Sequence, residues 1–332
     1  MDEITPNAAV ERYLEERKPE VAWSTYRNHR NSLRRFREWC EETGVEDLTT
    51  IDGFDLHDFK MWRREQDVNE RTLYNNLCTL RVFVQWAAAR DLLQDGLADQ
   101  MLMPDPDTGV RTDAIDADTA EEILSYYETY EPYSRRHATF AFLWSTGLRG
   151  GATRAIDLDD YHSDERYVEL HHRPDEDTPL KNDEKSEREV NLHKWLCDVL
   201  DGYIQMHRED VTDDYGREPL FSTTEGRIHR NTLRCNVVAL TRPCHYTNEC
   251  PHDREIDDCE AANYKYAGRC PSSVSPHDIR RSSISHWLDE GHRKELVSER
   301  MDVGTDTLDE HYDVRTEEQK RRLRREEFDM DR

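Results

Sequence analysis

Residues 275–287 read SPHDIRRSSISHW and hold a histidine and an arginine three positions apart, His277 and Arg280. On a helix this spacing places both side chains on one face. Since a guanidinium matches phosphate oxygens in a bidentate way, the pair can hold one anion. The apolar residues fit a helix whose other side packs into a core: Ile279, Ile284, Trp287 and Leu288.

One residue downstream and one upstream extend this pattern. Tyr312 follows in the polar segment DEHYD, and a tyrosine can act as a covalent nucleophile. Arg149 precedes it in STGLRGGA, on the turn expected to start a short helix after Gly147. A guanidinium on a rigid turn suits phosphate binding, and the alternative is an arginine at a helix start that pairs with a nearby Asp.

Taken together, these motifs and their order resemble the tyrosine recombinase (phage integrase) family over essentially the whole chain. The segments AIDLDDY (155–161) and TPLKN (178–182) are similar to its haloarchaeal branch. The resemblance implies an N-terminal SAM-like helical core-binding domain and a C-terminal catalytic domain. It also implies two phosphate-binding arginines, their histidine, a proton-donating hairpin lysine and the nucleophile: Arg149, Arg280, His277, Lys181 and Tyr312.

The chain departs from the family pattern at two positions. Ala152 stands where a glutamate often buttresses the first arginine, so another group must orient Arg149. Val303 stands where a histidine or tryptophan often helps to hold the scissile phosphate, and valine offers no hydrogen-bond donor. For the hairpin lysine, Lys181 is preferred because apolar neighbours fix it in PLKN, and Lys185 is the second choice.

The charge composition sets the conditions under which such a protein would work. The chain has 332 residues and a net charge of −26, and only eight of its 46 basic residues are Lys. A DNA-binding protein needs a positive surface. At 1 M salt, however, the repulsion between an acidic protein and DNA is screened within about 3 Å. Many acidic residues with few lysines are the surface expected of a protein that works in very high salt. We therefore expect a halophilic protein, the alternative being an ordinary acidic protein without a nucleic-acid partner.

Nothing in the sequence indicates a membrane or a secreted protein. No run of about 18 apolar residues is present, so we expect no membrane span. The N-terminal MDEITPNAAV is acidic and polar and does not resemble a signal peptide. We expect the protein to be cytoplasmic.

Residues 1–103 show four helical patterns and no strand pattern, which predicts a compact helical domain that binds DNA. Ser24 is the expected N-cap of the second helix. Residues 104–112, with two prolines and a glycine, form the expected linker. The second helix is rich in basic residues, which either contact DNA or form ion pairs on a solvated face: Arg27, Arg30 and Arg34 are the expected DNA contacts.

Residues 113–332 form the expected catalytic domain, which is mainly helical with a small β-hairpin. Its first helix has Asp118 as the expected cap, and two strands flank the long polar loop 174–187. A helix at 193–208 is expected to turn Trp195 inward, and residues 316–328 form a charged tail helix. A helix at 230–240 adds two further expected DNA contacts, Arg230 and Arg234.

An insertion at 242–272 concentrates cysteines. Four of the eight cysteines of the chain lie in this window, where a uniform distribution would place less than one. Four thiolates can close a structural zinc site, although the spacings are looser than in common zinc ribbons. The alternative is a set of free thiols: Cys244, Cys250, Cys259 and Cys270.

The resemblance implies site-specific cleavage and rejoining of double-stranded DNA through a 3′-phosphotyrosine, with no metal or ATP for catalysis. It also implies a homotetramer on two DNA sites. A type IB topoisomerase would share the chemistry, but the length and two-domain order favour a recombinase. The remaining alternative is a catalytically weakened DNA-binding protein on the same fold, which Ala152 and Val303 favour slightly.

Overall fold

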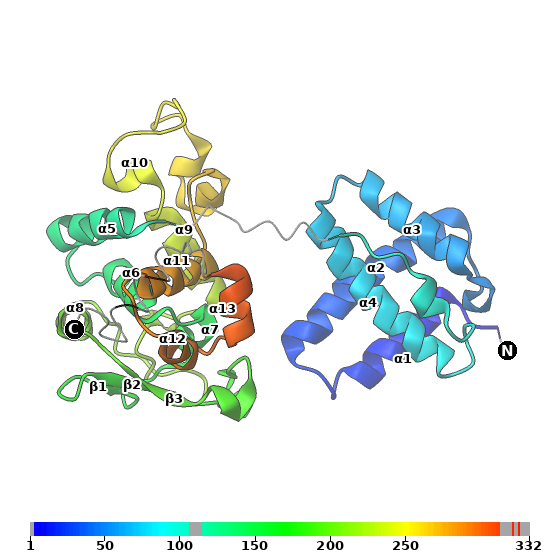
Figure 1. The fold of residues 1–332 in the computed structure, drawn as a ribbon, viewed down its shortest axis with the longest axis horizontal. Helices are drawn as coiled ribbons and strands as arrows, with labels where there is room; N and C mark the ends of the chain where they lie inside the picture. The colour runs from blue at the N-terminus through cyan, green and yellow to red at the C-terminus, as the bar shows by residue number, and fades with distance from the viewer. Residues whose placement is uncertain (1–2, 106–114, 313–320, 322–324, 326–332) are drawn as a thin grey trace. The chain divides into compact units, whose positions relative to one another are not determined.

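The computed structural model describes residues 3–105, 115–312, 321 and 325. The chain divides into two compact units, Met1–Val110 and Arg111–Arg332, and each is described by itself (Figure 1). The expected linker, 104–112, spans this division. Most of the linker and of the expected tail helix, 316–328, lies outside the described residues. The described part is mainly helical with two small antiparallel sheets, as expected from the sequence.

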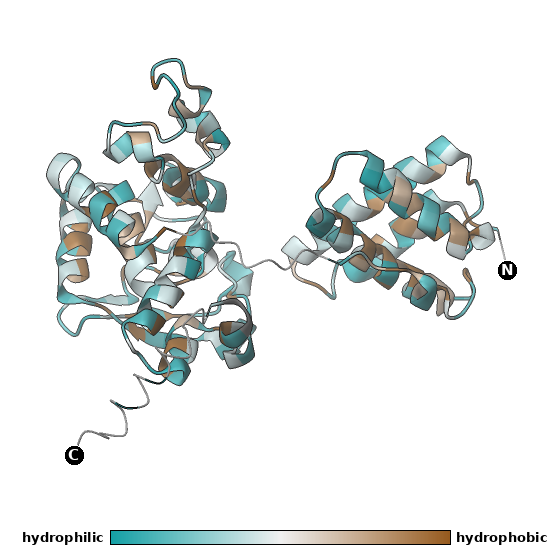
Figure 2. Ribbon diagram, turned by 45° about the horizontal axis from the view of Figure 1, so that its top comes forward, coloured by the Kyte–Doolittle hydropathy of each residue, from teal (hydrophilic) through white to brown (hydrophobic). Residues whose placement is uncertain are grey.

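The first unit is built from four helices: α1 (Pro6–Arg17), α2 (Trp23–Thr43), α3 (Gly53–Glu65) and α4 (Glu70–Ala88). Short 3-10 turns lie between α2 and α3 at Leu48–Thr50 and after α4 at Leu97–Gln100, and no strand lies within residues 3–105. The apolar faces of the helices meet in one core, and hydrophobic residues gather where the helices face each other (Figure 2). Aromatic and leucine side chains fill this core, including Tyr13, Leu33, Phe36, Phe59 and Phe83.

Helix starts follow capping chemistry, but two expected caps are wrong. The α2 helix begins at Trp23 after Ala22, which makes no side-chain cap, so Ser24 lies inside the first turn. In the second unit α5 (Ala117–Tyr130) is capped by Asp116, whose carboxylate accepts from the amide of Thr119 at 2.8 Å. Asp118 therefore lies in the first helical turn, where it complements the helix dipole.

The second unit is organised around the buried helix α6 (Arg135–Thr146). The helices α7 (Gly150–Ala155), α8 (Lys194–Met206) and α9 (Arg230–Leu240) add to the same core. Trp195 of α8 is 40% exposed, so its expected inward position is wrong. The side chains that α8 does bury recur about once per helical turn: Leu196 and Cys197, then Leu200, then Tyr203.

A three-stranded antiparallel sheet has the order β1 (Tyr161–His162), β2 (Tyr167–Leu170), β3 (Arg188–Asn191). In β2 and β3, Val168 pairs with Val190 and both are buried. The loop between these strands is the polar segment that carries Lys181 and Lys185. A second, two-stranded sheet pairs β4 (Ser222–Thr223) with β5 (Gly226–Arg227).

Three consecutive helices form the C-terminal part of the described chain: α11 (Pro276–Asp289), α12 (Lys294–Met301) and α13 (Thr305–His311). They share a small separate apolar cluster that includes Ile284, Leu288 and Tyr312. The expected insertion contains α10 (Pro243–Tyr246) and two 3-10 segments, Glu260–Ala262 and Tyr264–Arg269. Its buried Arg242 donates to the main-chain oxygens of Ala239 at 3.1 Å and Ala261 at 2.5 Å, which fastens the insertion to α9.

Candidate active site

Arg149 and Arg280 meet at the end of α6. The chain turns there at Gly147, which has a φ of +61°. A Cβ at Gly147 would stand 2.8 Å from the sulfur of Met301, so this tight turn requires glycine. Arg149 is the N-cap residue of α7, and Arg280 of α11 donates from Nη1 to the main-chain oxygen of Gly147 at 2.7 Å. This bond joins α11 to the turn that carries Arg149, although Gly147 and Arg280 lie 133 positions apart in the sequence.

Arg280 is held in this site at an energetic cost. The side chain is only 2% exposed. Burial lowers the pKa of Arg280 to about 10, and the neighbouring charges of Arg149 and Arg188 act in the same direction. A guanidinium that is desolvated beside other cations is stabilised by an incoming anion, which is the condition expected of a phosphate-binding group.

Arg188 is a third arginine in this cluster, and the sequence did not single it out. It opens β3 and donates to the main-chain oxygens of Arg300 at 2.9 Å and Ser186 at 2.7 Å. Burial lowers its pKa, Asp302 opposes this effect, and Arg149 adds to it. Its place directly after the hairpin loop was the available sequence signal.

Asp302 connects these groups. Its carboxylate forms an ion pair with Arg149, and its main-chain oxygen accepts from Arg149 Nη2 at 2.8 Å and from Arg280 Nη2 at 3.3 Å. Asn182 and Ser186 of the hairpin loop donate to the same carboxylate. Arg149 is thus paired with an aspartate, but with one 153 residues away that also ties it to Arg280. The sequence did not identify Asp302.

His277 is the second residue of α11 and remains exposed. The helix start is fixed by a capping box in which Ser275 and Asp278 bond reciprocally. Desolvation by the surrounding protein lowers the pKa of His277, and the charges of Arg281, Arg280 and Arg149 contribute in the same direction. The imidazole is therefore neutral at pH 7 and can accept a proton.

Tyr312 follows the last residue of α13 and is 7% exposed. It packs in the apolar cluster of α11 to α13, together with Val303, Met301 and Leu308. The interaction between Tyr312 and Arg280 raises the pKa of the arginine, so the phenol lies close enough to the guanidinium to affect it. Val303 is buried in the same cluster and Ala152 packs against the main core, so neither side chain supplies a polar group.

The two candidate lysines lie in the exposed part of the hairpin loop. Leu180, next to Lys181, is buried, as the apolar neighbours in PLKN predicted. Lys181 also directly precedes Asn182, whose amide donates to the carboxylate of Asp302 at 3.0 and 3.1 Å. Asn182 therefore anchors the loop beside Arg149 at the position next to Lys181.

The expected DNA-contacting arginines are all exposed. Arg27, Arg30 and Arg34 lie on α2, and Arg230 and Arg234 lie one turn apart on α9. The Nε of Arg34 lies 3.8 Å from Oε1 of Glu38. Part of the α2 face therefore carries ion pairs, which were the alternative to DNA contacts. Beside it, a polar hollow of about 680 Å³ is lined by Arg34, Arg35 and Arg63 with several Asn, Ser and Thr side chains.

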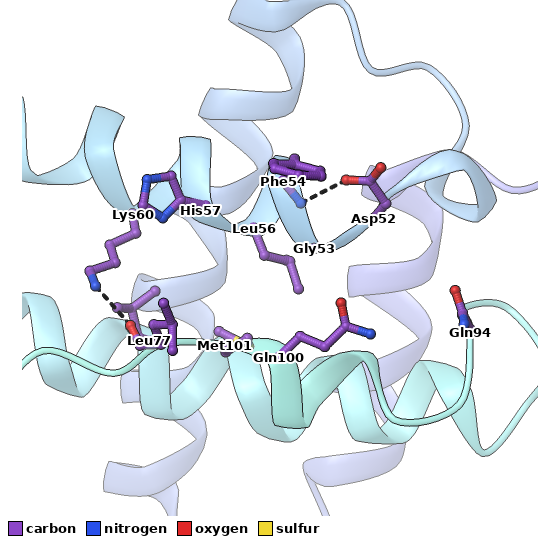
Figure 3. Close-up of a pocket in the computed structure, with 11 residues that line it drawn as sticks. Asp52, Gly53, Phe54, Leu56, His57, Lys60, Leu77, Gln94, Gln100 and Met101 are labelled. Carbon is purple, nitrogen blue, oxygen red and sulfur yellow. Dashed lines mark hydrogen bonds between the residues drawn. The ribbon is translucent and has the colours of Figure 1, made fainter.

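A different pocket, of about 480 Å³, lies in the first unit between α3, α4 and the segment Gln94–Leu102 (Figure 3). Lys60 donates to the main-chain oxygen of Leu102 at 2.8 Å on its rim, and Asp52 accepts from the amide of Phe54. None of the expected catalytic or DNA-contacting residues lines it. Concavity alone therefore does not mark the candidate site, which is defined by the converging arginines.

The four cysteines of the insertion are free thiols in the structure. Burial raises the pKa of Cys244, and its neighbours Cys270, Cys250 and Cys259 add to this effect. Among the residues that the structure describes, no group of three or more His, Cys, Asp or Glu side chains is arranged to hold a metal ion. The zinc site thus stays a prediction from the sequence, and no step of the chemistry is assigned to it.

Sequence comparisons relate the chain to known recombinases and integrases. Residues 10–91 match the family of the phage integrase N-terminal SAM-like domain. The chain is 24% identical over 313 residues to the tyrosine recombinase XerD of Mycobacterium tuberculosis and 23% identical over 311 residues to that of Mycobacterium leprae, covering 89% of this chain and 88% of each relative.

Two solved structures share the fold of the chain. The Tn1549 transposon integrase in complex with a circular intermediate DNA gives a TM-score of 0.72 at 13% identity, covering 97% of this chain and 99% of that one. A lambda integrase (residues 75–356) dimer bound to a core site gives 0.64 at 12% identity, covering 92% and 97%. Within the described ranges, no helix combines the length and apolar character that crossing a membrane requires.

Proposed function

The comparisons support membership of the tyrosine recombinase (phage integrase) family, and from that premise we propose that the chain cleaves and rejoins double-stranded DNA at specific sites. The observation that carries this proposal is the convergence of Arg149 and Arg280 beside Asp302. His277 lies on the same helix as Arg280, and Tyr312 is close enough to raise the pKa of that arginine. Two cations at one point suit the non-bridging oxygens of a single phosphodiester.

In the proposed reaction the Tyr312 oxygen attacks phosphorus and the bond from phosphorus to the 5′ oxygen breaks. A 3′-phosphotyrosine forms and the free 5′ hydroxyl leaves, so the phosphodiester energy is retained for rejoining. His277 accepts the phenol proton, because its imidazole is neutral at pH 7. Lys181 gives a proton to the leaving 5′ oxygen, with Lys185 as the second candidate for this step. Because the phosphodiester energy is retained, rejoining needs no ATP. The arginines supply the positive charge at the phosphate, so we propose that catalysis also uses no metal.

We propose that the exposed arginines of α2 and α9 bind the DNA backbone: Arg27, Arg30, Arg34, Arg230 and Arg234. Such contacts position the duplex without reading its sequence. We further propose that the working form is a homotetramer on two DNA sites. The excess of acidic residues and the shortage of lysine support a haloarchaeal type of this recombinase that acts in the cytoplasm at high salt.

The proposal is tested with nicked duplexes drawn from the DNA that flanks the gene, in molar KCl. The nick lets a short 5′-hydroxyl fragment diffuse away after cleavage and traps the covalent intermediate, which runs as a protein–DNA band on a denaturing gel. We expect the band and, with intact duplexes, exchange of strands between two sites. Relaxation of supercoiled DNA without strand exchange would instead identify a topoisomerase.

The second candidate, a DNA-binding protein with weakened catalysis, is favoured by the apolar side chains at positions 152 and 303 and by the burial of Tyr312. That candidate predicts tight binding of the same duplexes with no covalent band. Binding and trapping measured on one preparation therefore separate the two functions.

A further inference from the structure

Asp302 occupies an unusual position between the catalytic helices. It ends α12 with a φ of +50°, in the left-handed region that Asp and Asn tolerate better than most side chains. The next residue, Val303, is buried in the apolar cluster that contains Tyr312. The turn at Asp302 therefore directs its carboxylate toward the arginines while the following residue packs beside the nucleophile.

The contacts of Asp302 join three separate parts of the second unit. Arg149, at the start of α7, pairs with its carboxylate and donates to its main-chain oxygen at 2.8 Å. Arg280 of α11 donates to the same main-chain oxygen at 3.3 Å. From the hairpin loop, Ser186 donates to Oδ2 at 2.8 Å and Asn182 donates to both carboxylate oxygens.

We propose that Asp302 is a positioning residue that orients the Arg149 guanidinium for the scissile phosphate and fixes the loop that presents Lys181. The inference rests on the proposed recombinase function. The proposal also explains how Arg149 is oriented without the glutamate that the family often has at position 152. That position is Ala152, and the carboxylate that pairs with Arg149 comes from the end of α12 instead.

The charge state of Asp302 fits this role. Burial alone would raise the pKa of its carboxyl, but hydrogen bonds from Ser186 and Asn182 and the charge of Arg149 outweigh it and keep the pKa below the ordinary range. The carboxylate is thus ionised at neutral pH, and it offsets part of the repulsion among the arginines.

The geometry favours a supporting carboxylate over one that merely takes the place of the phosphate. A phosphate substitute would draw its bonds from the two catalytic arginines together. Instead, the hydrogen bonds of Arg280 go to the main-chain oxygens of Gly147 and Asp302, while two loop side chains donate to the carboxylate. The two bonds from Arg149 use two of the five N–H groups of a guanidinium, and a phosphate can be bound by others.

The test uses Asp302→Asn, which keeps the size of the side chain and its tolerance of positive φ. Asp306→Asn, in the exposed first turn of α13, is the matched control because it removes the same charge nearby. Single-turnover trapping on a nicked duplex should slow by about tenfold or more in Asp302→Asn, the scale of one lost charge-assisted hydrogen bond. The DNA affinity and melting temperature should stay close to those of the wild type, and the control should cleave normally.

A second substrate separates orientation of Arg149 from general damage to the fold. When an uncharged methylphosphonate replaces the scissile phosphate, there is less charge for Arg149 to neutralise. The gap between Asp302→Asn and wild type should then shrink to about threefold or less. A gap that is equally large on both substrates would overturn the role assigned to Asp302.

The remaining outcomes are equally decisive. Unchanged trapping by Asp302→Asn on the normal duplex, with an active wild type, would overturn this inference and leave the recombinase function standing. Faster trapping would show that the carboxylate competes with the phosphate and would overturn it as well. A wild type that forms no adduct on any duplex it binds would overturn the proposed function and this inference together.

Discussion

Replacement of Arg280 by methionine should separate stability from catalysis. Burial places this guanidinium at a pKa of about 10, against an ordinary arginine value of about 12.5. Each pH unit of such a difference corresponds to about 1.4 kcal/mol, so holding the charged side chain in the fold costs about 3 kcal/mol at neutral pH. Because the folded-state pKa is lowered, this cost is present at pH 7 and is relieved only as the pH rises above 10.

Arg280→Met removes that cost and also removes two charge-assisted hydrogen bonds to main-chain oxygens, worth about 1.5 kcal/mol or more each. The two effects nearly cancel, so we expect the free energy of unfolding of the second unit to stay within about 2 kcal/mol of the wild-type value. Cleavage should fall by about a hundredfold or more, because charge stabilisation at the phosphate is lost.

The assay is paired thermal or denaturant unfolding and single-turnover trapping at one salt concentration. Arg293→Met serves as the control, since it removes an exposed arginine that is not among the proposed DNA contacts. Destabilisation by more than about 2 kcal/mol would show that Arg280 mainly supports the fold. Retention of normal cleavage would show that it does not bind the reacting phosphate.

Four further predictions concern Arg149, the turn at Gly147, His277 and the cysteine-rich insertion. Arg149→Ala should abolish trapping but leave most DNA affinity, measured by gel shift, because many other arginines contact the backbone; equal loss of both would make it a docking residue. In an unfolding assay, Gly147→Ala should destabilise the second unit by about 2–4 kcal/mol, because its Cβ would combine a φ of +61° with a contact of 2.8 Å to the sulfur of Met301. Gly151→Ala, which has open space around the added Cβ, should be near neutral in the same assay. If neutral His277 accepts the phenol proton, the trapping rate should fall only below about pH 6.5, the ordinary imidazole value, because its pKa is lowered; a fall that begins above that pH and is absent in His277→Gln would contradict this role. If the insertion binds zinc, elemental analysis should find about one zinc per chain and chelation should destabilise the second unit, whereas less than about 0.2 zinc with four reactive thiols would exclude a closed structural site.

Local chemistry made much of the fold predictable. Helical periodicity located the helices of the first unit, and alternation located β2 and β3. The caps were less certain, since Asp116 and Asp118 both suit an N-cap, and the structure has Asp116 as the cap of a helix that buries Ala120 and Ile123. Trp195 could not be placed from the sequence, because the core is already filled by side chains on the other face of α8.

The candidate site was predictable as a set of motifs but not as a set of contacts. Family resemblance indicated Arg149, His277, Arg280 and Tyr312, and the structure brings the arginines together. The family resemblance could not indicate the partner of Arg149, because Asp302 lies 153 residues away and its role depends on a left-handed turn after α12. The alanine at position 152 showed only that Arg149 needs a partner other than the glutamate that the family often has there.

Tyr312 is the residue proposed to carry the covalent bond to DNA. Trapped complexes from a nicked duplex, digested with protease and mapped by mass spectrometry, test it most directly. We expect a nucleotide-bearing peptide that contains Tyr312 and no trapped complex from Tyr312→Phe. A nucleotide on Tyr264 or Tyr266, or an undiminished complex from Tyr312→Phe, would contradict it.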